Sequence, residues 1–174
     1  MEKEQRLILI NQFEILQQLN PYDADYYSGK IEILKEGYEY HYDDIFGEVY
    51  TPLSESDSRF VIDVLNMYRD INFSKKQFSV EDREKLEKEI TTIFRGFDFN
   101  DSTEVRLGGY AQFFIEKLDR FKELIEDEQF DDFNSHWPML ESYKKYLISY
   151  EKVKQLGEHK FGNLTVKQIK EILR

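Results

Sequence analysis

Apolar side chains recur every three or four residues along most of this chain, which is the spacing that lines one face of an α-helix. Segments 4–19, 60–71 and 107–125 each carry such a stripe. Alternating runs that would favour a β-strand do not exceed about five residues. The pattern predicts an all-α fold, a multihelical single domain of about six to eight helices that spans residues 1–174.

Capping residues and glycines mark where the helices should begin and end. Asn20–Pro21 is typical of a helix start, and Gly37 is typical of a helix end. Ser54, Ser79 and Thr165 are followed within three residues by acidic or amide side chains that complete a cap. We therefore expect a helix to begin directly after each of these residues.

Two of the expected helices decide where the core should lie. The helix after Ser79 is expected to end near Phe94, and a long helix over 107–125 is expected to be the central one. Gly108 and Gly109 fall inside this long helix, where each costs about 1 kcal/mol relative to alanine. Glycine at such positions indicates close packing or a bend.

The first expected helix has apolar residues on more than one side. Asn11 and Gln12 lie on or beside its apolar stripe, between Ile8 and Ile15. Buried amides are nearly always hydrogen-bonded, so this pair should fix how the helix docks, in the core or in an interface.

The composition is that of a globular protein about one domain long. The chain has 174 residues, of which 40% are hydrophobic and 34% charged. It contains no cysteine, which excludes a disulfide framework, a thiolate zinc site and a cysteine nucleophile. The 35 acidic and 24 basic side chains give a net charge of −11, which would repel a phosphate backbone. We therefore expect no direct contact with nucleic acid.

The two ends of the chain carry further information on location and partners. No basic region precedes a long apolar stretch at the N-terminus, and no run approaches the ~20 apolar residues of a membrane helix. This predicts a cytoplasmic protein without membrane contact. Segment 144–174 has eight basic and three acidic side chains, which favours docking on the acidic body or on a neighbouring subunit.

Several short segments occur in an order that is known from one family. They are Gln5–Leu9 with Asn11 and Gln12, Gly37–Tyr38, Ile62–Tyr68, Gly96–Asp98 with Glu104, Arg106 and Tyr110, Phe133–Asn134 and Pro138–Met139 with Tyr143, and Leu164–Thr165 with Ile169. Together these segments span essentially the whole chain, which therefore resembles the YfbU family of uncharacterised bacterial proteins.

The resemblance implies a helical fold and no established activity. Some members of the family look like a domain of this kind joined to a helix-turn-helix DNA-binding domain, an arrangement that suits a ligand-sensing or interaction role. This chain has no residues to spare for such an added domain. It also has the bulky Phe99 after Asp98, where some relatives carry glycine, and this puts a shared loop conformation in doubt.

Asp98, Glu104, Arg106 and Tyr110 form the first candidate ligand-binding group. The Arg106 guanidinium could bind a carboxylate or phosphate, with Asp98 or Glu104 orienting it. The alternative is that Asp98 caps a turn, Glu104 favours the helix start and Arg106 pairs within the protein. The frequency of carboxylates as helix caps favours this alternative.

His136 and Trp137 complete the candidate ligand site, because they precede the proline that should open a helix. The histidine could close a pocket or transfer a proton. No second catalytic group is apparent, so an alternative is favoured in which Trp137 anchors the loop on the core and Asn134 or Ser135 caps the helix.

Metal and cofactor binding have little support. His41, Asp43 and Asp44, completed by His136 or His159, match no established ligand spacing. The chain has no phosphate-binding loop, dinucleotide fingerprint or nucleophile elbow. We therefore expect no metal, no cofactor and no catalytic residue.

The function predicted from these features is a helical module that self-associates or senses a small polar ligand, without catalytic activity. The 14 Phe and 12 Tyr side chains exceed what one small core can absorb, so exposed aromatics should form the surface of a homo-oligomer. The alternative is a small hydrolase-like enzyme with a site around Arg106 and Tyr110. A third possibility is an acidic mimic of nucleic acid, which fits little besides the charge.

Overall fold

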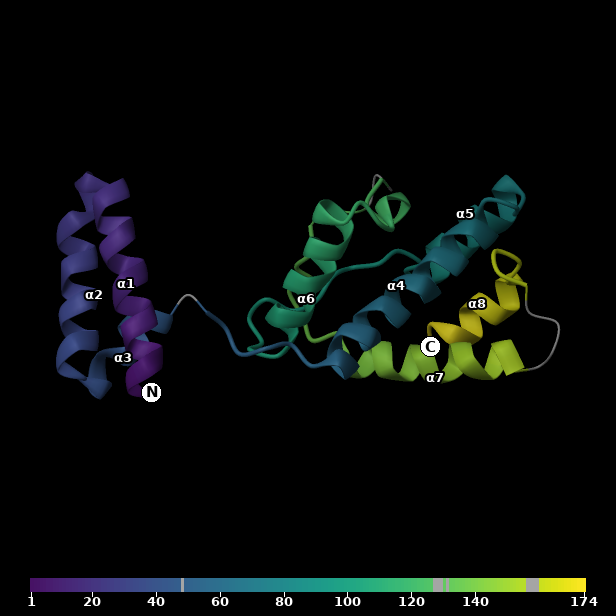
Figure 1. Cartoon of the computed structure of the whole chain (residues 1–174). Helices are drawn as coiled ribbons and strands as arrows, with labels where there is room; N and C mark the ends of the chain where they lie inside the picture. Colours follow the sequence, from purple (N-terminus) through teal and green to yellow (C-terminus); the bar gives the residue numbers. More distant parts are fainter. Residues whose placement is uncertain (48, 127–129, 131, 156–159) are drawn as a thin grey trace. The chain divides into compact units, whose positions relative to one another are not determined.

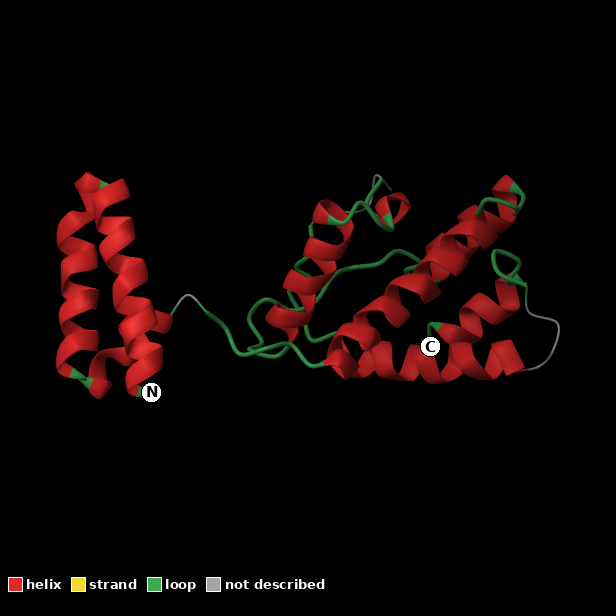
Figure 2. Ribbon diagram, viewed as in Figure 1, coloured by secondary structure: helices red, strands yellow, loops and turns green. Residues whose placement is uncertain are grey.

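The computed structural model describes residues 1–47, 49–126, 130, 132–155 and 160–174, and these residues form helices without a β-strand (Figure 1, Figure 2). The predicted all-α fold is confirmed, with eight α-helices in the described part of the chain. The chain divides into two compact units, Met1–Pro52 and Leu53–Arg174. The expectation of one domain over 1–174 stays a prediction, and each unit is described by itself.

The first unit is a helical hairpin of α1 (Lys3–Leu19) and α2 (Ala24–Glu36), which run side by side in opposite directions (Figure 1). A 3₁₀ turn begins at Pro21, and α2 ends at Gly37, whose φ of 74° is the left-handed conformation that glycine adopts readily. Both predicted boundaries are therefore confirmed. The short α3 (Tyr42–Phe46) follows.

The core of this unit is small. Its buried residues are Ile10 from α1 and Ile31 and Leu34 from α2. Partly buried side chains around them are Leu9, Phe13, Tyr42 and Ile45. Few apolar side chains of α1 are thus withdrawn from water, although the helix carries apolar residues along its whole length.

The second unit is built around α4 (Glu55–Lys75), which contributes more buried residues than any other described helix. Helix α7 (Leu140–Gln155) packs across it (Figure 1). The remaining helices are α5 (Val80–Glu89), α6 (Glu104–Gln112) and α8 (Val166–Ile172). The expectation that 107–125 would form the central helix is therefore wrong.

The predicted helix caps are confirmed in this unit. The Ser54 hydroxyl accepts a hydrogen bond from the backbone at the start of α4, and Ser79 does the same for α5. Thr165 and Gln168 form a capping box at the start of α8.

Four aromatic rings form the centre of the second unit. Tyr68, Phe94, Phe97 and Tyr143 are all buried, with neighbouring ring centroids 5.3–6.0 Å apart. The Tyr143 hydroxyl donates to the Gly96 carbonyl oxygen at 2.8 Å, and burial raises the pKa of this phenol well above its ordinary value. The cluster therefore joins α4, α7 and the segment before α6.

The helix after Ser79 ends at Glu89 and does not reach Phe94. Ile90 already has extended backbone angles, with φ −153° and ψ 143°. The next residues leave the helix and carry the Phe94 ring into the aromatic cluster. Tertiary burial of Phe94 therefore outweighs the local helical pattern.

The long helix expected over 107–125 is interrupted. Helix α6 passes into a π-helical turn, η3 (Phe113–Lys117), and Phe121 then has a positive φ of 57°. Phe121 is buried beneath the Arg69 guanidinium, whose central carbon lies 3.8 Å from the ring centroid. A 3₁₀ turn, η4 (Lys122–Leu124), follows and packs on α4. The apolar spacing continues past the end of the helix because the apolar residues of this compact turn, Phe121 and Leu124, are also buried.

A short backbone pairing supports the segment before α6. The Phe97 N–H donates to the Phe133 carbonyl at 2.9 Å, and the Ser135 N–H donates to the Phe97 carbonyl at 3.0 Å. Gly96 precedes this pairing with a φ of 75°. A Cβ atom at Gly96 would overlap the Phe133 carbonyl group, so the close approach needs glycine.

We predict that Gly96→Ala destabilises the protein by more than about 2 kcal/mol, since the left-handed conformation alone costs a side chain 1–2 kcal/mol and the overlap adds to it. Gly109→Ala is the matched control, because a methyl group there meets no atom within 4 Å inside α6. This variant should gain about 0.5–1 kcal/mol. Urea unfolding followed by circular dichroism would check both variants. Equal unfolding midpoints for the two variants would contradict the requirement for glycine at position 96.

Candidate functional site

Glu104 is the most constrained residue of the predicted ligand group. It opens α6, and its carboxylate is buried, with 2% of the residue exposed. The carboxylate oxygens accept hydrogen bonds from the backbone N–H groups of Asp98 at 2.9 Å, Met139 at 3.0 Å and Leu140 at 2.8 Å. Glu104 therefore has a structural role, but it caps the start of α7 from a distant part of the chain, whereas the alternative considered above assigned it to the start of its own helix.

Asp98 also has a structural role. Its Oδ1 atom accepts hydrogen bonds from the backbone N–H and the side-chain amide of Asn100, both at 2.9 Å. The cap of α6 is Asp101, whose Oδ1 accepts from the N–H groups of Thr103 and Glu104 at 2.9 and 2.8 Å. Asp98 thus closes the turn and Asp101 caps the helix.

Phe99 explains one of the two glycines in α6. A Cβ atom at Gly108 would overlap the Phe99 ring, so this glycine leaves room for close packing. The Phe99 N–H donates to the Asn134 side-chain oxygen at 3.1 Å, and the same oxygen accepts from the His136 N–H at 3.1 Å. The turn before α6 and the turn before α7 are therefore tied together.

His136 and Trp137 line a cavity of about 200 Å³ together with Phe94, Arg95 and Asn134. His136 has a φ of 60°, and half of Trp137 is exposed. The Trp137 indole N–H donates to the Met139 sulfur at 3.0 Å. The cavity could hold a small molecule against the indole and the imidazole.

The six predicted site residues do not converge on this cavity. Arg106 and Tyr110 are absent from its lining, and the Tyr110 ring packs against Phe113 and Phe114. The enzyme alternative required Arg106 with His136 or Tyr110 around a common point. The arrangement does not favour it.

His41 forms a simple exposed pair. Its Nδ1 atom lies 3.1 Å from an Asp44 carboxylate oxygen. Within the residues that the structure describes, no group of three His, Asp or Glu side chains could hold a metal ion. His159 lies outside the described residues. No helix in the described ranges is both long and apolar enough to cross a membrane.

An apolar face of α1 remains open to solvent. Leu7, Ile8, Ile15 and Leu19 are each more than half exposed, at 54–71%. Asn11 and Gln12 are exposed on the same face, so the expected role in the core is wrong, and a role in an interface stays a prediction. The excess of apolar residues in segment 4–19 was the sequence signal for this surface, because a hairpin core uses only one side of the helix.

A second cavity, of about 260 Å³, lies in the second unit and was not predicted. Its lining includes Asn72 and Lys75 from α4 and Arg83 from α5. In the sequence these residues read as ordinary polar positions of amphipathic helices. The sequence signal for this cavity is weak, because it consists of the polar ends of two helices that are joined by a short turn.

Comparison with known proteins places the chain in a family. The family model described as the YfbU domain matches residues 1–174. The chain is also 36% identical to a UPF0304 protein of Methanocaldococcus jannaschii over 152 residues, which cover 87% of this chain and 88% of that protein. This relative is archaeal, so the similarity extends beyond bacterial proteins.

We predict that Glu104→Gln lowers the free energy of unfolding by about 2–3 kcal/mol, because the amide has one acceptor oxygen where the carboxylate serves three backbone donors. Glu116→Gln is the control, since Glu116 is exposed and its carboxylate accepts a hydrogen bond from the neighbouring Gln112 side chain. It should change stability by less than about 0.5 kcal/mol. Equal losses for the two variants in urea unfolding would contradict the capping role.

Proposed function

Because the chain belongs to the YfbU family, which carries no established activity, we propose that it is a helical interaction module that self-associates through the exposed face of α1. The observation that carries this proposal is the row of Leu7, Ile8, Ile15 and Leu19, each more than half exposed on one helix. Large apolar patches on a surface are typical of interaction sites.

The small core of the first unit supports the proposal. The buried residues in the described part of the hairpin unit are Ile10, Ile31 and Leu34, while four large aliphatic side chains of α1 face water. Full burial of each such side chain contributes roughly 1.5–3 kcal/mol. Covering this face would therefore add several kcal/mol to a unit with little core of its own.

A second copy of the chain is the occupant that fits this face best. Besides its aliphatic residues, the face carries neutral amides from Asn11, Gln12 and Gln18. An amide donates and accepts hydrogen bonds, so it can pair with the same group across a two-fold axis. The charged residues nearest this face are Lys3, Glu4 and Glu14, and Glu14 already pairs with Lys35. The face therefore has no excess of one sign that would favour a partner of opposite charge.

The length of α1 suits a helix-to-helix contact. At a rise of about 1.5 Å per residue, its 17 residues give a face roughly 25 Å long. Two hairpins that meet along α1 would form a four-helix arrangement, a common solution for burying such faces. Tyr22 and Tyr40, both more than nine-tenths exposed, lie in the same unit and supply aromatic rims of the kind that interfaces favour.

The remaining parts of the functional prediction stay proposals. The acidic net charge of −11 supports the absence of a direct nucleic-acid partner. A cytoplasmic location rests on the sequence argument alone. Small-ligand sensing is a second candidate function, and the cavities of the second unit favour it.

We predict that the wild-type protein sediments as a dimer or larger assembly at micromolar concentration. The double variant Ile8→Glu/Ile15→Glu should weaken this association by about a hundredfold or more, since two carboxylates would be desolvated in the interface. Analytical ultracentrifugation measures both. Ile148→Glu is the matched control, because Ile148 is an equally exposed isoleucine on α7.

Three outcomes would overturn this proposal. The first is a wild-type monomer throughout the micromolar range. The second is a double variant that associates as strongly as the wild type, and the third is a loss of association in Ile148→Glu alone. Circular dichroism should show unchanged helix content in all variants, since each substitution is on an exposed helix position.

A further inference from the structure

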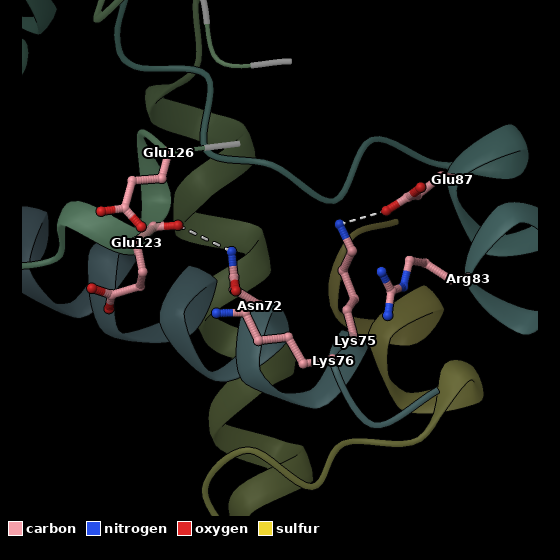
Figure 3. A pocket seen from close by; sticks show the side chains of 7 residues that line it. All are labelled: Asn72, Lys75, Lys76, Arg83, Glu87, Glu123 and Glu126. Atoms are coloured by element: carbon pink, nitrogen blue, oxygen red, sulfur yellow. Dashed lines mark hydrogen bonds and ion pairs between the residues drawn. The ribbon is translucent and has the colours of Figure 1, made fainter. Parts of the chain in front are cut away.

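The 260 Å³ cavity of the second unit is lined by charged side chains of both signs (Figure 3). Lys75 and Lys76 come from the end of α4, and Arg83 reaches toward Lys75 from α5. Glu123 and Glu126 lie on the opposite side, at and after η4 (Figure 3). The cavity therefore carries both signs of charge throughout, with Glu87 beside Lys75 and the Lys76 amino group on the side of Asn72 and Glu123 (Figure 3).

Two of these charges are already neutralised within the protein. The Lys75 amino group, on a residue only 7% exposed, lies 2.7 Å from a Glu87 carboxylate oxygen. Glu123 pairs with Arg69. Burial raises the pKa of the Glu123 carboxyl, but the hydrogen bond and charge of Arg69 outweigh it and leave the pKa below its ordinary value. These pairs fix the walls of the cavity.

Three charged groups are left for other partners. The side chains of Arg83, Lys76 and Glu126 make no ion pair with another residue in the described part of the chain. Lys76 lies 5.2 Å from the centroid of the Phe73 ring and is otherwise exposed. The cavity thus offers two cations and one carboxylate to whatever occupies it.

Two buried polar atoms at the cavity have no hydrogen-bond partner among the described residues. They are the Nε donor of Arg83 and the Oδ1 acceptor of Asn72. The Asn72 amide nitrogen donates to the Glu123 carbonyl at 3.3 Å, which holds the side chain in place and leaves its oxygen free to accept. Buried groups of this kind are costly unless satisfied, so each indicates a missing partner.

A ligand that satisfies both atoms must carry an acceptor for Arg83 and a donor for Asn72. A carboxylate suits the planar guanidinium of Arg83. An ammonium group suits the Asn72 oxygen, with Glu126 adding a negative charge. The three carboxylates of the lining disfavour a dianion such as phosphate, and its three cations disfavour a simple amine.

We propose that this cavity is a binding site for a small zwitterion of the α-amino acid class. The volume of about 260 Å³ lies just below the range that accommodates drug-sized ligands, so it suits a single small molecule. The ligand would join α5 to α4 and η4, which are the elements that line the cavity. This inference is independent of the α1 face, because every residue it uses belongs to the second unit.

The test uses free L-amino acids as probes with the full chain. Each of the common L-amino acids at millimolar concentration is screened by thermal shift, and any that raises the melting temperature is measured by calorimetry. Acetate, methylammonium and inorganic phosphate are compared at the same ionic strength. We expect at least one amino acid to bind and the three comparison probes to bind at least about tenfold more weakly, because each carries charge of one sign and can satisfy Arg83 or Asn72 but not both.

Substitutions locate the site. Arg83→Gln should weaken binding of the amino acid at least about tenfold. Lys76→Gln, at an exposed position, should weaken this binding by a smaller factor. Arg120→Gln is the matched control, since Arg120 is an exposed arginine of the same unit that does not line the cavity. The melting temperature without ligand should be unchanged in Arg83→Gln and Lys76→Gln, because neither side chain has a protein ion pair to lose.

Several results would overturn the proposal. They are no binding by any amino acid, equally strong binding of acetate or phosphate, and binding that Arg83→Gln and Lys76→Gln leave unchanged. The Ile8→Glu/Ile15→Glu variant, measured in the same assay, separates this inference from self-association. Binding that survives in this variant while association is lost would support both proposals. A wild-type protein that associates but binds no amino acid would remove only the cavity proposal.

Discussion

One buried carboxylate holds the second unit together. Glu104 satisfies the N–H of Asp98 in the preceding turn and the two N–H groups at the start of α7. Desolvating a carboxylate costs several kcal/mol unless donors of this kind compensate it, so the turn, α6 and α7 stabilise one another through Glu104. Tyr143, inside α7, returns to the carbonyl of Gly96 in the same region. The polar residues that resembled a ligand site are therefore the junction of the fold.

Features that depend on neighbouring residues could be predicted from the sequence. The ends of helices at Gly37, Ser54, Ser79 and Thr165 follow from caps within a few residues, and the structure contains all of them. The interrupted helix after Gln112 could not be predicted, because the cause is the packing of Phe121 beneath Arg69, more than fifty residues earlier. Where a distant contact determines the backbone conformation, the apolar spacing continues through the break in the helix. The break therefore cannot be recognised from the sequence.

The candidate sites show the same limit. The residue types around Asp98 and Glu104 were consistent with ligand binding and with capping, and only their hydrogen bonds decide for capping. The cavity at Arg83 is formed by three segments whose charges look like solvated helix surface when read singly. What distinguishes it is the burial of a guanidinium nitrogen and an amide oxygen without partners, which no spacing in the sequence records.

The two proposed activities use different physical forces in different units. Association through α1 draws on apolar area in Met1–Pro52, whereas the cavity of the second unit draws on charge and hydrogen bonding in a small enclosed volume. A sensing module needs a free energy of coupling between such sites, and linkage requires that coupling to be reciprocal. If the amino acid changes the dimer dissociation constant by some factor, dimer formation must change the affinity for the amino acid by the same factor. Equal affinity in the monomer and the dimer would mean that the chain binds and associates without sensing.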